Sequence, residues 1–153
     1  MTQQIDPRGP QFTAAVTAVV LAVVLVTAPS ALATALLAAQ AVLFGIGALL
    51  GVQRTPHAWV FRKLVRPRLA ATAEWEDPAP PRFAQAVGLG FAVVGLVGFG
   101  ADVAALGLVA TGFALVAALL NAVFRFCLGC EMYLIIRRLS PTGPSRRTPI
   151  TTN

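Results

Sequence analysis

Long apolar stretches alternate with polar segments along this chain of 153 residues. Four of the stretches have the length of a transmembrane helix, and they lie at residues 12–28, 31–52, 83–99 and 103–125. Each would cross roughly 30 Å of hydrocarbon as a helix. Lipid offers the backbone no hydrogen-bond partner, which favours helices over irregular chain. The pattern predicts an all-α fold, a four-helix transmembrane bundle built from two tandem helix hairpins.

The polar segments divide the chain around this bundle. We expect an N-terminal segment at residues 1–11 and one transmembrane domain at 12–139, with a loop between the hairpins at 53–82. Residues 126–139 are predicted to be an interfacial segment that contains both cysteines. The polar tail at 140–153 contains Pro and Thr residues and is predicted to be disordered.

Composition and charge support a membrane protein and give it an orientation. The chain is 57% hydrophobic and only 12% charged, whereas soluble domains are about 25% charged. Basic residues occur near both termini and in the loop at 53–82, and the two short turns within the hairpins have none. The positive-inside rule therefore predicts that the loop and both termini are cytoplasmic. This distribution accounts for the net charge of +6, and no basic, aromatic-rich stripe indicates nucleic-acid binding.

The basic residues also indicate the kind of organism and the membrane in which the protein lies. Eleven of the 12 Lys and Arg residues are Arg, which is typical of a GC-rich bacterial genome. We therefore expect a multi-pass protein of the bacterial inner (plasma) membrane.

An internal repeat is indicated by two similar segments. The sequences DPRGPQFTAAV (6–16) and DPAPPRFAQAV (77–87) share the pattern D-P-x-x-P-x-F-x-x-A-V, and each precedes the first helix of a hairpin. At the same offset of 71 residues, Arg54 aligns with Arg125. A local interpretation stays open, because an acidic residue and a proline both suit the first turn of any helix.

The expected interior of the bundle contains many small residues and few polar ones. Small residues recur at every fourth position in the expected third and fourth helices, which predicts close helix packing within the bundle or at a homo-oligomer face. Gln40 and Asn121 are the main polar side chains within the spans. The absence of a deep ionisable residue disfavours a proton-coupled transporter, and a small transporter of neutral substrates remains open.

The strongest candidate for chemistry is the pair Cys127 and Cys130, spaced C-x-x-C beyond the last span. Gly129 between them is expected to mark a bend or a helix start. Arg125 would favour the reactive thiolate, whereas Glu131 would oppose it. Three interpretations remain open: packing by small apolar side chains, thiol redox or sulfur relay, and metal binding with further ligands.

The matching part of the first half contains the only histidine. His57 would lie at the depth of the cysteines if the two halves pack equivalently, and it would then be a candidate tuning residue and proton acceptor. The sequence leaves contact between them open.

Several motifs together resemble a known family. TPHAWVFRKLVRPRL, EDPAPPRFAQAVG and CLGCEMYL, spread over roughly residues 5–139, are similar to the bacterial membrane family known as domain of unknown function 4395. The resemblance implies a small four-helix membrane protein found in the context of thioredoxin-like or sulfurtransferase proteins. It supplies no site residues beyond the matching Cys127 and Cys130.

These observations predict a thiol-redox or sulfur-relay component of the membrane. A soluble thioredoxin-like or rhodanese-like protein would be the partner at the cytoplasmic face, and no cofactor is predicted. The alternatives are a structural or accessory subunit or small transporter with packing cysteines, and a metal-binding membrane protein. Whether the protein is an enzyme is left open.

Overall fold

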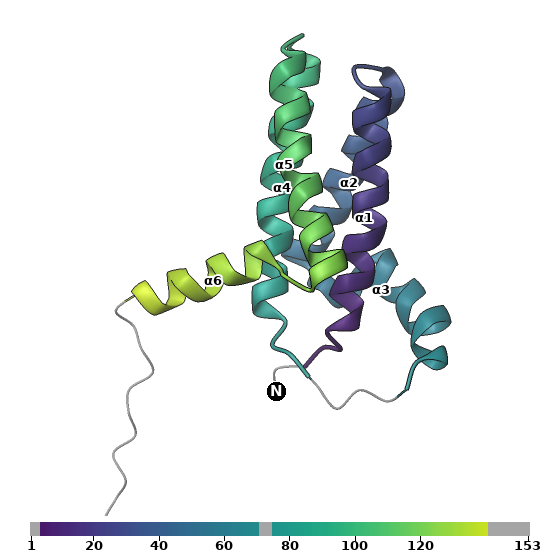
Figure 1. Ribbon diagram of the computed structural model, residues 1–153, viewed down its shortest axis with the longest axis vertical. Coiled ribbons are helices and arrows are strands. Elements are labelled where there is room, and N and C mark those ends of the chain that lie inside the picture. Colours follow the sequence, from purple (N-terminus) through teal and green to yellow (C-terminus); the bar gives the residue numbers. More distant parts are fainter. Residues whose placement is uncertain (1–3, 71–74, 141–153) are drawn as a thin grey trace, which may run out of the picture.

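The computed structural model describes residues 4–70 and 75–140, and this part of the chain is helical apart from one isolated backbone bridge (Figure 1). Its four long helices are α1 (Arg8–Thr27), α2 (Ala31–Leu49), α4 (Ala79–Gly100) and α5 (Ala104–Phe124). Each is long and apolar enough to cross a membrane. The predicted all-α four-helix bundle is confirmed. The expected disorder of the tail falls, beyond Ser140, outside the described residues.

The four long helices pack in a closed ring. Helix α1 contacts α2 and α5, and helix α4 contacts the same two helices. The turns at 28–30 and 101–103 lie together at one end of the bundle, and the shorter helices lie at the opposite end (Figure 1). The outward faces carry many exposed large apolar side chains, including Val19, Val42, Val94, Val109 and Val116. Lipid would cover these faces, which suits a bilayer environment.

Small residues allow the helices to approach each other closely. A Cβ added at Gly88 would lie 2.9 Å from the ring of Phe44, and one added at Gly95 would lie 2.9 Å from the Leu37 side chain. Helices α2 and α4 therefore pack through glycines, as small residues do in lipid. The buried hydrophobic core between the four long helices includes Leu21, Leu37, Phe44 and Ala92.

Helices α1 and α4 begin ahead of their apolar runs, and in the same way. Asp6 Oδ1 accepts a hydrogen bond from the Arg8 backbone N–H at 3.0 Å, and Asp77 Oδ1 accepts one from the Ala79 N–H at 2.9 Å. These carboxylates satisfy backbone donors that the first helical turn leaves free. The chain before each helix is also paired, since Ile5 and Glu76 exchange backbone hydrogen bonds of 2.9 and 3.0 Å.

The starts of α1 and α4 also bind the ends of their neighbours. The Gln11 side chain donates to the carbonyl of Ala122 near the end of α5 at 2.9 Å. The Arg82 guanidinium donates to the carbonyls of Ala48 and Leu49 at the end of α2, at 3.2 and 3.1 Å. Carbonyls at a helix C-terminus have no partner within the helix, so both contacts stabilise a helix end.

The loop expected at 53–82 is largely helical in its first half. It contains η1 (Val52–Arg54), α3 (Pro56–Val60), the π-helical η2 (Phe61–Val65) and η3 (Arg66–Arg68). Phe61 anchors this segment, because its ring is buried and its centroid lies 5.9 Å from that of Phe12 on α1. Residues 71–74 lie outside the described part of the loop.

The last helix, α6 (Leu128–Leu139), leaves the bundle at a steep angle and runs away from it (Figure 1). Leu128, Met132, Ile135 and Ile136 are exposed and share one face by their spacing, whereas Glu131 and Arg138 lie on other faces. An amphipathic helix of this kind suits the plane of a membrane surface.

Candidate functional site

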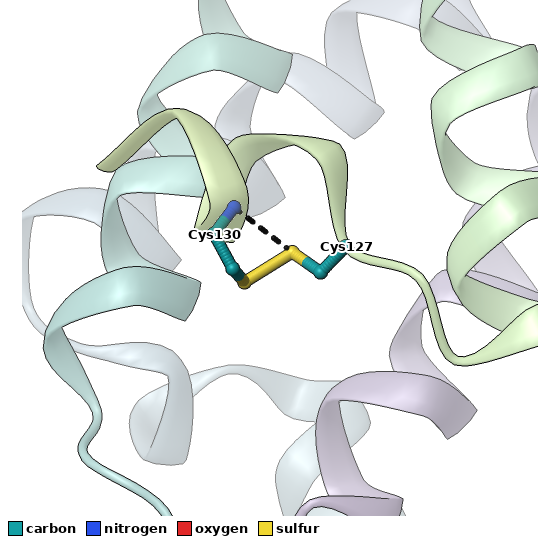
Figure 2. Close-up of a disulfide and its surroundings, with 2 residues drawn as sticks. All are labelled: Cys127 and Cys130. Atoms are coloured by element: carbon teal, nitrogen blue, oxygen red, sulfur yellow. Dashed lines mark hydrogen bonds between the residues drawn. A yellow bond between two sulfur atoms is a disulfide. The ribbon is translucent and has the colours of Figure 1, made fainter. Parts of the chain in front are cut away.

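The two cysteines lie at the sharp turn between α5 and α6. Arg125 ends α5 in the left-handed conformation, with φ 56°. Cys127 then adopts extended backbone and is the N-cap of α6, and its Sγ accepts a hydrogen bond from the Cys130 N–H at 3.3 Å. Figure 2 shows both side chains at this turn, on the connecting loop and the first turn of α6. A helix start was one of the two alternatives expected at Gly129, and α6 begins one residue earlier, at Leu128.

Cys127 and Cys130 form a disulfide, with Cα atoms 5.2 Å apart (Figure 2). The bond joins the N-cap to the third residue of the same helix and does not connect α6 to another helix. A loop of four residues restricts the unfolded chain little, and loop-closure entropy alone accounts for about 2 kcal/mol of stabilisation. The disulfide is therefore a weak structural crosslink.

Gly129 lets the start of α6 press against α4. A Cβ added at Gly129 would lie 2.6 Å from both the Cα and the Cβ of Ala84. Further along α6, the Tyr133 ring packs against Phe83 with centroids 5.8 Å apart, and the Arg137 guanidinium lies 5.8 Å from the Tyr133 ring. These contacts hold the disulfide against the bundle even though α6 itself projects outward.

On one side, the disulfide opens to a cavity of about 670 Å³, which we call the polar cavity. Both cysteines line it, together with Gln11 and Asn121. Its charged lining residues come from three places in the chain and are Arg8, Glu76, Asp77, Arg125 and Glu131. Both cysteine side chains are partly exposed, so the polar cavity gives solvent and thiols access to the disulfide.

On the other side lies a smaller space of about 240 Å³ between the helices, which we call the apolar cavity. It is lined by parts of α1, α2, α4 and α5 and by the start of α6, including Cys127 and Gly129. Small side chains of α5, Ala114, Ala117 and Ala118, border it. Cys130 is not among the residues that line it, whereas Cys127 lines both cavities.

The structure brings Arg125 to the predicted cysteine pair but does not bring His57 there. Arg125 is exposed and lines the polar cavity with both cysteines. His57 is on α3, and α3 and α6 lie on opposite sides of the bundle in Figure 1. His57 lines neither the polar nor the apolar cavity. Partial burial removes water from the imidazole and lowers the pKa of His57 below its usual 6.5.

Among the described residues, no group of three or more His, Cys, Asp or Glu side chains is placed to hold a metal ion. The metal alternative therefore gains no support from side chains that converge on the cysteines.

Sequence reasoning did not assign two residues to the site. Asn121 lines both cavities, as Cys127 does. The sequence feature that could have identified it is a polar side chain within an apolar span. Gly129 was interpreted as a bend or a helix start, yet its role is the close approach to Ala84. The C-x-G-C spacing alone does not reveal this contact, because the contact depends on which helix packs against Gly129.

The family model for a domain of unknown function (DUF4395) matches residues 5–138. The chain therefore belongs to this family, as its motifs indicated. Neither the curated proteins nor the solved structures include a match to the chain. The class of protein is thus defined by two features: four membrane-compatible helices, and a cysteine pair after the fourth of them.

Proposed function

We propose that this protein is a bacterial integral membrane protein that exchanges thiols and disulfides, or relays sulfur, through Cys127 and Cys130. The observation that carries the proposal is the accessible disulfide at the start of α6, open to the polar cavity. A soluble thioredoxin-like or rhodanese-like protein would present its cysteine there.

The position of the pair suits reversible chemistry. Its short loop limits the stabilisation from loop closure to about 2 kcal/mol, so the bond can be reduced with a modest loss of stability. The N-terminus of α6 favours a thiolate at Cys127, because the Cys130 N–H already points at Cys127 Sγ. A stabilised thiolate is a good leaving group and makes a disulfide easier to reduce. Arg125 would add to this effect.

This polarity predicts which sulfur the partner attacks. A partner thiolate would attack Cys130 Sγ, and Cys127 would leave as the stabilised thiolate. The second thiol of a dithiol partner then attacks the mixed disulfide and releases Cys130. The partner becomes a disulfide, and the membrane protein becomes a dithiol.

We assign the cysteine end of the bundle to the cytoplasm. Arg8, Arg62, Arg125 and Arg137 all lie on segments at this end, and the turn at 101–103 at the opposite end contains Asp102 (Figure 1). The positive-inside rule supports this orientation. The cytosol is reducing, so the dithiol form would be continually regenerated there.

Thiol trapping in native membranes tests the exchange. Free thiols are labelled with a maleimide reagent after equilibration at a series of dithiol redox potentials, and a two-electron transition of the pair is expected. The variants C127S and C130S are then incubated with a thioredoxin-like protein that lacks its second cysteine and whose remaining cysteine is activated as a disulfide with 2-nitro-5-thiobenzoate, which leaves as the free thiol when the mixed disulfide forms. C127S, which keeps Cys130, should trap more mixed disulfide than C130S.

Two results would overturn the proposal. Labelling that does not change with potential would favour cysteines that only pack, and the absence of a mixed disulfide in both variants would exclude exchange with a protein thiol. The double variant C127S/C130S is the control for labelling elsewhere, because the chain contains no other cysteine.

A further inference from the structure

The geometry points to a membrane quinone as the electron acceptor of the reduced cysteine pair, with the apolar cavity as its binding site. This inference rests on the proposed thiol exchange and adds a second substrate to the same site. It is carried by the position of Cys127, which lines both the polar cavity and the apolar cavity, whereas Cys130 lines only the polar cavity.

The apolar cavity suits the ring of a lipid-soluble molecule. Its volume of about 240 Å³ is below the roughly 300–1,000 Å³ of sites that enclose a whole drug-sized ligand. A ring would fit, and an isoprenoid tail would extend between helices into lipid. Phe91 and Phe113 stack at the cavity with ring centroids 6.2 Å apart, which provides an aromatic wall.

Polar groups occur at both ends of this apolar space, as a quinone with two opposed oxygens requires. Asn121 lies at the cysteine end, where the two cavities meet. Thr17 lines the deeper part, about 9 Å along α1 from Gln11, which binds the end of α5. Thr17 is only 3% exposed, and its Oγ1 accepts a hydrogen bond of 3.3 Å from Gln40. Its own hydroxyl proton can therefore donate to a ligand oxygen.

The chemical step balances without another reactant. The Cys127 thiolate adds to the quinone ring, and the Cys130 sulfur then attacks Cys127 Sγ and forms the disulfide. The carbon–sulfur bond breaks, and its electron pair stays on the ring. The two thiol protons end on the quinone oxygens. One dithiol and one quinone therefore give one disulfide and one hydroquinone.

A quinone also explains how a cysteine pair on one side of the membrane can pass electrons on. Both cysteines of the chain are in this one pair, so no second pair can carry electrons to the opposite face. A quinone collects them within the bilayer. The partner thiol would then use Cys130 from the polar cavity, while the quinone uses Cys127 from the apolar cavity.

The test follows disulfide formation without oxygen. The full-length protein is placed in vesicles of phosphatidylethanolamine and phosphatidylglycerol, reduced with dithiothreitol and freed of the reductant. Short-chain ubiquinone or a short-chain menaquinone analogue is added, and thiol labelling and hydroquinone absorbance are recorded. We expect the disulfide to re-form with an equal amount of hydroquinone, and vesicles without quinone to remain reduced.

Filling the apolar cavity separates quinone binding from thiol chemistry. A118L should slow oxidation by quinone at least about tenfold, a difference of about 1.4 kcal/mol in barrier. Its oxidation by diamide, a water-soluble reagent, should proceed at the wild-type rate. The matched control is A86L, since Ala86 is exposed on α4 and lines neither cavity. N121L, which replaces the amide with an apolar side chain of the same number of heavy atoms, provides a second variant should A118L not fold.

The outcomes distinguish this inference from the proposed function. If quinone leaves the wild-type dithiol reduced while diamide and the thioredoxin-like protein react with it, the quinone site is overturned and thiol exchange stands. If A118L and N121L both react with quinone at the wild-type rate, the apolar cavity is not the site. If none of the three reagents acts on the pair, thiol exchange fails as well.

Discussion

The two hairpins leave the bundle by similar turns that carry different chemistry. After α2, Gly51 has φ 102° and Thr55 caps α3, its Oγ1 accepting from the Ala58 N–H at 3.3 Å. After α5, Arg125 has φ 56° and Cys127 caps α6, its Sγ accepting from the Cys130 N–H at the same distance. Each turn thus contains one residue with positive φ, followed by a side-chain cap three residues before its donor, although only Arg125 is in the left-handed helical region.

The two turns share the cap spacing from residue i to i+3, and they differ in the backbone that leads into the cap and in the two side chains at these positions. Threonine and alanine form a stable cap in the first turn, whereas two cysteines form a cap that is also a disulfide in the second. A helix N-cap brings residues i and i+3 together, which is the arrangement that a small disulfide needs. The proposed redox site therefore combines a capped helix start with a left-handed residue at Arg125, and its surroundings would decide what the pair reacts with.

The largest expected effect comes from removing one sulfur. C127S should abolish the disulfide and stop turnover at a mixed disulfide of Cys130, while the serine oxygen keeps a cap acceptor for the Cys130 N–H. Under oxidising conditions the free energy of unfolding should fall by about 2 kcal/mol, and under reducing conditions it should change little. Thermal unfolding in detergent with and without dithiothreitol measures both values.

The matched control is T55S, which keeps the cap of the first turn; its difference in stability from the wild type should be the same with and without dithiothreitol. An equal loss of stability for C127S in both conditions would contradict the comparison, because it would mean that the cysteines act by packing.

The second prediction moves the cysteine pair to the other turn. T55C/A58C, made in a C127S/C130S background, should form a disulfide with diamide, because the cap geometry matches that of the natural pair. Thr55 lines a different cavity, of about 560 Å³, and does not line the apolar cavity. The transplanted dithiol should therefore remain reduced when quinone is added. Gain of quinone-driven oxidation would show that the cap alone is sufficient and that the apolar cavity has no part in it.

The third prediction concerns the close contact that holds α6. G129A places a methyl group against Ala84 and should lower the free energy of unfolding by about 1–3 kcal/mol, as overpacking does. It should also speed labelling of the reduced cysteines, because α6 moves away from α4. G90A on α4 is the control, since nothing lies within 4 Å of an added Cβ there. An alanine in that position should be neutral or stabilising by up to about 1 kcal/mol. Equal behaviour of the two variants would remove Gly129 from the site.

The membrane helices could be predicted because their signal is local. An apolar run of sufficient length determines a helix in lipid, whatever its neighbours are. The N-terminal extension of α1 and α4 beyond those runs depends on the Asp6 and Asp77 caps, which the shared D-P pattern already contained. The internal repeat stays a prediction. It is supported by the equivalent contacts of Gln11 and Arg82, 71 residues apart, with the ends of α5 and α2.

The geometry of the site could be predicted only in part. Spacing identified the cysteine pair, but the turn between α5 and α6 depends on a non-glycine residue in the left-handed conformation, for which Arg125 gives no sequence signal. Equivalent depth in the two halves suggested His57 as a neighbour of the cysteines. The exit segments α3 and α6, however, leave the bundle in opposite directions (Figure 1). Direction after a turn is a tertiary property, and hydropathy does not encode it.

The smallest effect is expected at His57. This residue should affect the stability of the first turn and should have no effect on the reaction of the cysteines in the second. Burial lowers the pKa of His57 in the folded protein, so between that value and about 6.5 the unfolded chain binds more protons. The contribution of His57 to stability is therefore complete above about pH 6.5 and decreases as the pH falls toward the folded pKa. H57Q should remove this pH dependence and leave the pH profile of cysteine exchange unchanged, because His57 lines neither cavity of the pair. Thermal unfolding from pH 5 to pH 8 measures the change in stability, and maleimide labelling over the same range measures the reactivity of the cysteines. An altered labelling profile in H57Q would contradict the prediction, because it would show that His57 affects the cysteine pair.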